Sequence, residues 1–193
     1  MAKTAVSLEP RLKTLYKGEL VKTLKKELNL NNVSQVPKLD KVVVSCGTGK
    51  HKEDKKYQEI VANTISSITG QMPMGKQAKK SIATFKIRKG LGGPIGYSVT
   101  LRGDKMYEFV DRLISVALPH VRDFHGVPLK SFDMSGNYNL GLSEQSIFPE
   151  LDFEETQILH GLEITFVIKN GSKDGSQLLL KSFGMPFEKG KES

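Results

Sequence analysis

Two alternating segments near the middle of the chain, residues 84–88 and 97–102, most constrain the fold. Each alternates apolar with polar side chains, which is typical of a strand with one packed face. The glycine-rich stretch between them, residues 90–96, predicts a tight reversal, so the sequence predicts a β-hairpin. Its packed face is expected to hold Phe85, Ile87, Tyr97, Val99 and Leu101. Its polar, cationic face is expected to hold Lys86, Arg88, Ser98, Thr100 and Arg102.

Apolar spacing predicts the other elements. Helices are expected at residues 10–28, 53–69 and 104–117, and Asp174 is expected to cap a last helix that ends at residue 183. Further strands are expected at residues 41–46, 138–142 and 162–169. This order indicates an α+β fold, in which a mainly antiparallel sheet carries helices on one face. A doubly wound parallel sheet is less favoured, because a short turn rather than a crossover helix joins the central strands.

Length and composition bound the remaining choices. With 193 residues and 38% hydrophobic side chains, the chain is expected to form a single domain, residues 1–193, that ends in a short basic tail at 188–193. The single cysteine, Cys46, excludes an intrachain disulfide and a multi-cysteine zinc site, which fits a reducing compartment such as the cytoplasm. Neither a signal peptide nor a membrane span is expected.

Charge is strongly polarised along the chain, whose net charge is +8. Residues 60–103 contain no acidic side chain, and their cations are Lys76, Lys79, Lys80, Lys86, Arg88, Lys89 and Arg102. A cationic surface without counter-charges attracts polyanions, and phosphate neutralisation is the main source of affinity for nucleic acids. Residues 131–168 reverse the pattern, since they contain seven acids and neither Lys nor Arg. The chain is therefore expected to meet a nucleic acid and a second kind of partner.

One segment suggests an enzyme instead. Residues 42–50 form a strand that enters a glycine turn and ends in Lys50, as in a phosphate-cradling loop. The spacing differs from a P-loop, because Val44 stands where a glycine is needed and His51 where Ser or Thr is needed. A phosphate-utilising enzyme built on this turn is the alternative from a different functional class, and a strand-to-helix turn is the favoured interpretation.

No catalytic or metal-binding set stands out. Cys46 with His51 could form a nucleophile pair, but a lone cysteine that ends an apolar strand is typical of a small core residue. The histidines lack metal-ligand spacing, and the acids between Glu144 and Glu163 lack the spacing of an EF-hand. We therefore expect no enzymatic activity, no cofactor and no metal.

A flat sheet face that carries hydroxyls and cations can dock on an RNA minor groove, where 2′-hydroxyls and phosphates are accessible. Strand parity would place Lys86, Arg88, Thr100 and Arg102 on such a face. No row of aromatic side chains is expected there, so stacking on single-stranded bases is less favoured.

Collinear segments over residues 10–187 resemble a known family, the universal large-subunit ribosomal protein five of bacterial type. The matching segments are 36–41 (VPKLDK), 68–71 (ITGQ), 78–81 (AKKS), 85–90 (FKIRKG), 94–96 (PIG), 99–103 (VTLRG), 118–119 (LP), 122–124 (RDF), 130–133 (KSFD), 136–138 (GNY), 144–145 (EQ), 147–150 (IFPE) and 183–187 (FGMPF). So many ordered matches are far more specific than any single short motif.

The resemblance implies a structural protein of the large (50S) subunit in the cytoplasm. It implies binding to 5S rRNA in the central protuberance, contacts with 23S rRNA and with neighbouring large-subunit proteins, and no homo-oligomer. It also implies contact with the P-site tRNA and, across an intersubunit bridge, with small-subunit protein thirteen. A non-ribosomal RNA chaperone is a further alternative, which co-migration with the large subunit on a sucrose gradient would exclude.

Individual positions are carried over from the resemblance. The polar positions that recognise RNA in the family correspond to Ser45, Gln71 and Thr100, and strand parity adds Lys86, Arg88 and Arg102 to the expected 5S rRNA site. The tRNA contact is assigned to the loop that carries Lys76, Lys79 and Lys80. The bridge is assigned to the irregular acidic region that contains Phe124, His125, Glu144, Glu150 and Asp152.

The sequence also departs from the family pattern. Ser45 stands where the family generally has Asn, so the RNA hydrogen bond there is expected to be shorter-reaching, water-mediated or lost. Lys76 replaces a small hydroxyl residue, and the turn at residues 90–96 is two residues longer than is common. His125, Ser143 and the pair at 134–135 stand where basic or glycine residues are frequent.

Overall fold

A five-stranded antiparallel sheet organises the molecule. The computed structural model describes residues 9–51, 53–85, 87–90, 93–152 and 156–188. The strands lie in the order β2-β3-β1-β5-β4. Their bounds are Lys38–Gly47 (β1), Met74–Lys76 (β2), Gly96–Leu101 (β3), Tyr138–Leu142 (β4) and Leu162–Lys169 (β5). Every neighbouring pair is antiparallel, so the predicted α+β class is confirmed.

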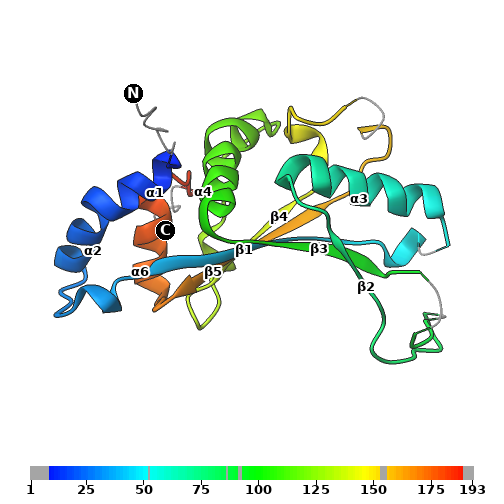
Figure 1. Cartoon of the computed structure of the whole chain (residues 1–193), viewed down its shortest axis with the longest axis horizontal. Helices are drawn as coiled ribbons and strands as arrows, with labels where there is room; N and C mark the ends of the chain where they lie inside the picture. Colours follow the sequence, from blue (N-terminus) through cyan, green and yellow to red (C-terminus); the bar gives the residue numbers. More distant parts are fainter. Residues whose placement is uncertain (1–8, 52, 86, 91–92, 153–155, 189–193) are drawn as a thin grey trace, which may run out of the picture.

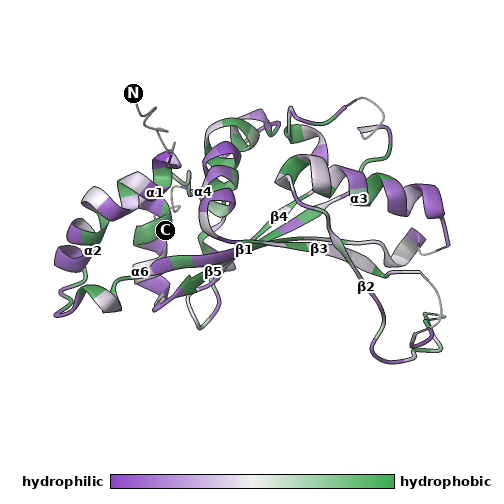
Figure 2. Cartoon of the chain, viewed as in Figure 1, coloured by the Kyte–Doolittle hydropathy of each residue, from purple (hydrophilic) through white to green (hydrophobic). Residues whose placement is uncertain are grey.

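Helices cover one side of this sheet (Figure 1). They are α1 (Arg11–Leu15), α2 (Val21–Glu27), α3 (Lys55–Thr69), α4 (Gly103–Arg112) and α6 (Lys173–Ser182). In Figure 1, α3 and α4 lie along the sheet, whereas α1, α2 and α6 lie together at the end where β1 begins. Hydrophilic and hydrophobic residues alternate along the helices in Figure 2, as expected of helices with one packed side. Within the described ranges, none of the helices combines the length and apolar character that a membrane crossing requires.

The N-terminal helical run is confirmed, with a wider turn at its centre. A π-helical segment, Tyr16–Leu20, joins α1 to α2, so the chain is helical from Arg11 to Glu27. The run buries Leu12, Tyr16 and Leu24. The Tyr16 hydroxyl donates to the Pro37 carbonyl oxygen at 3.0 Å. This bond fixes the helical run to the segment that leads into β1.

The helix α3 has the signals that its sequence predicts. The Asp54 side chain accepts a hydrogen bond from the Tyr57 backbone N–H at 3.2 Å, which caps the first turn. Gly70 ends the helix with φ 64°, in the left-handed region where glycine is favoured. Val61, Ile65 and Ile68 are fully or almost fully buried.

The predicted central hairpin is wrong in one of its strands. β3 forms as expected, but it pairs with β1 on one side and with β2 on the other. The described residues of 84–88 belong to none of the five strands of the sheet, and Ile87 forms an isolated bridge with Ile82 instead. Phe85, expected on the packed face, is 66% exposed. Both hydrogen-bonding edges of β3 are already occupied, so the described part of residues 77–93 lies in a loop beside the sheet.

The start of the last helix needs a smaller correction. Ser172, rather than Asp174, is the N-cap of α6, and its hydroxyl accepts the Gly175 backbone N–H at 3.1 Å. Asp174 lies in the first turn, where a carboxylate favours the positive end of the helix dipole. The predicted helix over residues 104–117 is confirmed as α4 and a π-helical continuation, Leu113–Ala117.

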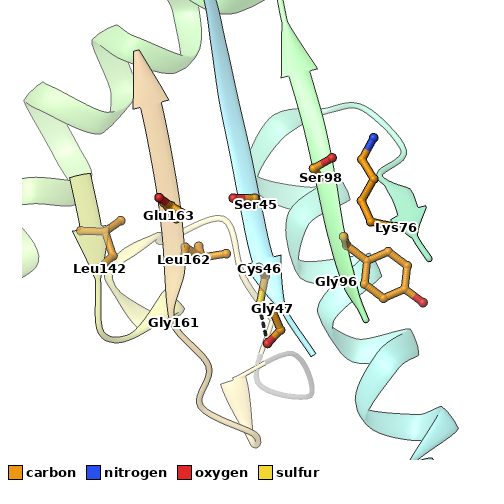
Figure 3. A pocket seen from close by; sticks show the side chains of 11 residues that line it. Ser45, Cys46, Gly47, Lys76, Gly96, Ser98, Leu142, Gly161, Leu162 and Glu163 are labelled. Atoms are coloured by element: carbon orange, nitrogen blue, oxygen red, sulfur yellow. Dashed lines mark hydrogen bonds between the residues drawn. The ribbon is translucent and has the colours of Figure 1, made fainter. Parts of the chain in front are cut away.

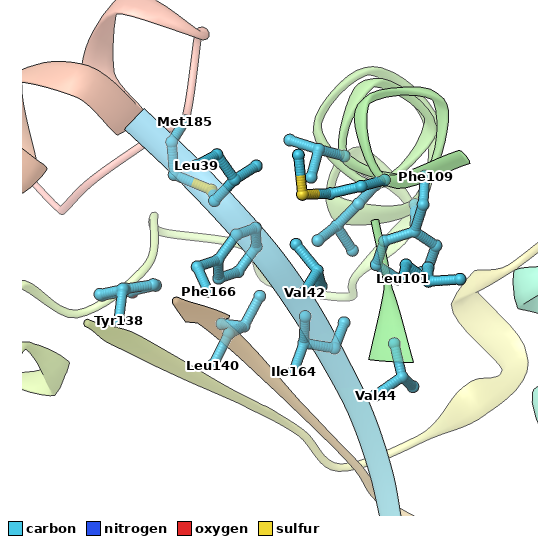
Figure 4. Close-up of a cluster of buried hydrophobic side chains, with 14 of the residues drawn as sticks. Leu39, Val42, Val44, Leu101, Phe109, Tyr138, Leu140, Ile164, Phe166 and Met185 are labelled. Atoms are coloured by element: carbon cyan, nitrogen blue, oxygen red, sulfur yellow. The ribbon is translucent and has the colours of Figure 1, made fainter. Parts of the chain in front are cut away.

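The core lies between the sheet and the helices. Val42 and Val44 of β1, with Ile164 and Phe166 of β5, have no exposed surface. Figure 4 shows these side chains on the same side of the sheet as Phe109 of α4. Burial alternates along β1 and β5 and over residues 99–101 of β3, so the other side of each strand faces away from the core.

Candidate nucleic-acid interface

The side of the sheet that lies away from the helices, called the open face below, is lined mainly by short polar side chains, with Val43, Glu163 and Gly141 among them. Strand register sets them in two neighbouring rows across the sheet. One row runs Thr100, Val43, Thr165 and Asn139, and the next runs Ser98, Ser45, Glu163 and Gly141. Thr100 is exposed and Ser45 and Ser98 are half-buried. Each hydroxyl can donate one hydrogen bond and accept others, which suits the 2′-hydroxyls and phosphates of RNA.

A hollow of about 420 Å³ lies at one end of the open face (Figure 3). In Figure 3, Glu163, Ser45 and Ser98 lie side by side on three neighbouring strands. The hollow is lined by Ser45, Cys46, Gly47, Lys76, Gly96, Tyr97, Ser98, Leu142, Gly161, Leu162 and Glu163. It therefore combines hydroxyls, one cation, one acid and three glycines.

The predicted 5S rRNA positions separate in the structure. Ser45 and Thr100 lie on the open face, as strand parity predicts. Arg102 follows β3, where its guanidinium lies 3.4 Å from the Asp40 carboxylate. Both side chains of this ion pair are largely exposed, so water screens the attraction between them and the pair is weak. The Arg102 guanidinium can therefore still attract another anion. Arg88 lies outside the sheet, so its predicted place on the sheet face is wrong, and Lys86 lies outside the described residues.

Gln71 approaches the same end of β3 from the helix side. It is exposed and directly follows Gly70 at the end of α3. The Lys105 ammonium donates to the Gly70 carbonyl oxygen at 3.3 Å, which ties this turn to the start of α4. Because β2 runs antiparallel to β3 from Met74 opposite Ser98, the residues before Met74 lead toward the Thr100 end of β3.

The chain from Lys76 to Gly90, called the basic loop below, leaves the sheet at β2. Its described cations, Lys76, Lys79, Lys80, Arg88 and Lys89, are all exposed. The Lys89 backbone N–H donates to the Ser81 hydroxyl at 3.0 Å, beside the Ile82 to Ile87 bridge. The ion pairs found among the described residues all lie in other parts of the chain. The loop therefore presents cations to solvent without neutralising carboxylates.

The residues assigned to an intersubunit bridge do not form one cluster. Phe124 and Glu144 line a second hollow, of about 630 Å³, which His120 and Arg122 also line. Glu150 instead binds the Arg112 guanidinium at 2.6 Å. The same guanidinium donates to the Ile68 carbonyl oxygen at 2.9 Å, so Glu150 helps to join α4 to α3. His125 and Asp152 are exposed, as a role in partner contact requires.

The segment proposed as an enzymatic alternative is a turn between β1 and α3. Cys46 is 4% exposed, and burial raises the pKa of its thiol to about 11. At neutral pH it is therefore the protonated thiol, a poor nucleophile. The His51 ring lies against Tyr57, with 4.4 Å between the ring centroids. Among the described residues, no three or more His, Cys, Asp or Glu side chains gather as metal ligands would.

Sequence reasoning missed two parts of the interface. β2 is three residues long and contains a glycine, so it carries no strand signal of its own. Glu163 is one of the seven acids of residues 131–168, but its place in the alternating β5 sequence puts it on the open face. Strand parity, applied to β5 as it was to β3, could have found it.

Comparison with known proteins gives consistent matches over most of the chain. A family described as ribosomal protein L5 matches residues 32–88, and one described as the C-terminus of the ribosomal L5 family matches residues 94–187. The large ribosomal subunit protein uL5 of Francisella philomiragia is 47% identical over 178 residues, which are 92% of this chain and 98% of that protein. The uL5 of Francisella tularensis subsp. novicida is 48% identical over 178 residues, which are again 92% of this chain and 98% of that protein. The uL5 of Alkaliphilus oremlandii is 47% identical over 179 residues, or 93% of this chain and 99% of that protein.

Proposed function

The chain belongs to the L5 family of large-subunit ribosomal proteins, and on that basis we propose that it binds 5S rRNA and helps to attach it in the central protuberance. As a member of this family it is a structural component of the large ribosomal subunit and not an enzyme. Its partners are ribosomal RNA and ribosomal proteins, and in bacteria the large subunit lies in the cytoplasm. The individual contacts below are proposals.

The observation that carries the 5S rRNA proposal is the pair of hydroxyl rows on the open face. Ser45 and Thr100 lie on neighbouring rows, on the side of the sheet that faces away from the described helices, with Gln71 near the Thr100 end of β3. Side chains this short leave a flat surface, so the backbone of an RNA helix can approach it closely. Strands held on both sides by neighbours fix the hydroxyl positions before binding, which limits the entropy lost on association.

The basic loop supports a second contact, with the P-site tRNA. Lys76 is exposed in β2 at the edge of the hollow, and Lys79 and Lys80 are exposed on the chain that leaves β2. Cations on an extended loop can follow a phosphate backbone without a fixed register. Contacts with 23S rRNA are proposed to draw on the same excess of positive charge.

The acidic region is proposed to contact small-subunit protein thirteen. Glu144 and Asp152 are exposed and lie in the part of the chain that has neither Lys nor Arg. Acidic surfaces are repelled by RNA, so in a ribosome they suit a basic protein. Glu150 would contribute less, because Arg112 already neutralises it.

An electrophoretic mobility shift with 5S rRNA tests the main proposal. Thr100→Leu should weaken binding about tenfold at every salt concentration, because it replaces a hydroxyl by a bulky apolar group. The matched control is Thr23→Leu, the same change at an exposed position on α2. If about five phosphates are neutralised, the logarithm of the affinity should fall with log salt at a slope of about −3.5 to −4.5. Wild-type affinity for 5S rRNA no greater than for an unrelated duplex would contradict the proposal.

A further inference from the structure

The hollow on the open face has one property that phosphate binding does not explain. Its described lining contains a carboxylate, Glu163, which lies directly opposite Ser45 in the strand register. Glu163 is exposed, and an ionised carboxylate can only accept hydrogen bonds. It would repel an RNA phosphate, so an RNA group seated here must present donors.

The hollow also has room for a flat ring. Gly47, Gly96 and Gly161 line it at or beside the ends of β1, β3 and β5. A Cβ atom at Gly96 would lie 2.9 Å from the Cys46 carbonyl oxygen, and one at Gly161 would lie 3.0 Å from that of Leu142. Side chains are therefore disfavoured at both positions, and the backbone remains bare. Glycine within a sheet often marks a place where a ligand approaches the backbone closely.

The donors that fit a carboxylate identify the ring. Guanine carries two adjacent donors, N1–H and N2–H, on its Watson–Crick edge, and they match the two oxygens of a carboxylate. Adenine and cytosine each offer one amino group beside an acceptor, which a carboxylate repels. Uracil places its single N–H between two carbonyl oxygens. Unpaired bases of RNA are read on this edge, so Glu163 favours guanine.

Lys76 supplies the opposite charge across the hollow. It lies in β2 opposite Gly96, and Figure 3 shows its side chain on the far side of β3 from Glu163. A lysine ammonium binds a phosphate as a point charge. A nucleotide whose base meets Glu163 can therefore have its phosphate near Lys76, with the Ser45 and Ser98 hydroxyls between them.

We propose that this hollow binds an unpaired guanine nucleotide of ribosomal RNA, with Glu163 accepting the N1–H and N2–H of the base and Lys76 contacting its phosphate. The inference rests on the proposed function, because it takes RNA to be the ligand of the open face. It goes beyond that function by naming the base and the residue that selects it. Glu163 acts here as a specificity residue in binding.

The test uses the full chain and labelled heptauridylates that carry guanosine, inosine or adenosine at the centre. Fluorescence anisotropy at low salt should show guanosine bound about tenfold more tightly than adenosine, as expected for a bidentate base contact. Inosine lacks the N2 amino group and should fall between them. In Glu163→Gln the preference for guanosine over adenosine should disappear, because the amide keeps one acceptor and gains a donor. The matched control is Glu108→Gln, which removes the same charge from an exposed position on α4 and should keep the preference.

The inference is overturned by equal affinities for the three heptamers, by a guanosine preference that survives in Glu163→Gln, or by no binding of the guanosine heptamer at millimolar concentration. A mobility shift with 5S rRNA, run on the same protein, separates this failure from failure of the proposed function. Tight 5S binding with no guanosine preference removes only the guanine site. A guanosine preference that depends on Glu163, without selective 5S binding, removes only the 5S rRNA assignment.

Discussion

The open face and the basic loop differ in how they combine charge with structure. The open face lies on strands whose neighbours fix them, and its central rows carry hydroxyls with few charges. The basic loop carries most of the cations of the acid-free stretch, but the sheet holds it only through β2. Fixed hydroxyls can select an RNA shape, whereas cations on a loop mainly add affinity. If both regions bind RNA as proposed, the open face selects the shape of the RNA and the basic loop attracts its phosphates.

The largest expected difference between the two regions is in folding stability. Phe166→Ala should lower the free energy of unfolding by about 3–5 kcal/mol, because it leaves a cavity in the core beneath the open face. Phe166 has no exposed surface, whereas Phe85 of the basic loop is 66% exposed. Phe85→Ala is the matched control and should cost less than about 1 kcal/mol. Urea unfolding followed by circular dichroism measures both values.

The same experiment tests whether the chain is one domain, as we propose. Tyrosine fluorescence and circular dichroism should report the same wild-type transition, because all strands share one sheet. Two separated transitions would contradict the single domain. A cost for Phe85→Ala equal to that of Phe166→Ala would remove the contrast between the two regions.

Salt dependence should distinguish the two regions at an intermediate size of effect. Combining Lys79→Ala with Arg88→Ala should reduce the steepness of log affinity for rRNA against log salt by about 1.5, or roughly 0.7–0.9 for each phosphate that is no longer neutralised. Thr100→Leu should lower the affinity and leave the slope unchanged. Filter binding over a range of salt concentrations measures both effects.

The control for the loop variant removes two cations elsewhere. Lys22 and Lys26 are exposed on α2, and replacing both by alanine should leave the slope as in the wild type. If the α2 variant flattens the slope as much as the loop variant does, attraction is spread over the surface and the basic loop has no special part.

Acid should produce the smallest effect, and it should act on the sheet side alone. His160 is 5% exposed, its Nε2 atom has no hydrogen-bond partner among the described residues, and burial lowers its pKa. The unfolded chain has the ordinary value of about 6.5. The stability that His160 contributes is therefore complete above that pH, and is lost as the pH falls toward the lower pKa of the folded state. Urea midpoints should drop between about pH 7 and pH 5 in the wild type and drop less in His160→Gln. Equal slopes in both proteins would exclude His160 as the cause.

Sequence alone predicts the regular parts of this fold. β3 and β5 follow clear alternation, β1 contains a β-branched run, and α3 has a cap, an apolar stripe and a stop glycine that agree with one another. The error at residues 84–88 has a physical cause. Alternation shows that a segment can pack one face as a strand, but it does not show which strand the segment pairs with. Which strand takes the edge of β3 depends on tertiary competition, and there the short β2 prevails over a segment with stronger local signals.

The candidate site is predictable to the same limit. Parity places Ser45 and Thr100 correctly, because both lie within strands that form as expected. Arg88 is misplaced because its strand does not form. The resemblance assigns Glu150 to the bridge, and its ion pair with Arg112 could not be predicted from the sequence, since that contact joins residues far apart in the chain. Local patterns predict which way a side chain points, and only the fold shows which partner it meets.

The position of β1 in the sheet affects how the protein folds while it is being synthesised. β1 is translated early, yet Val42 lies between Leu101 and Phe166, and the latter is made long after β1. One edge of β1 therefore stays without its partner until β5 has left the ribosome. Pairings between such distant segments form slowly. A nascent chain that ends before β5 has neither Glu163 nor the core side chains of that strand, so the sheet that carries the open face is incomplete until β5 is made.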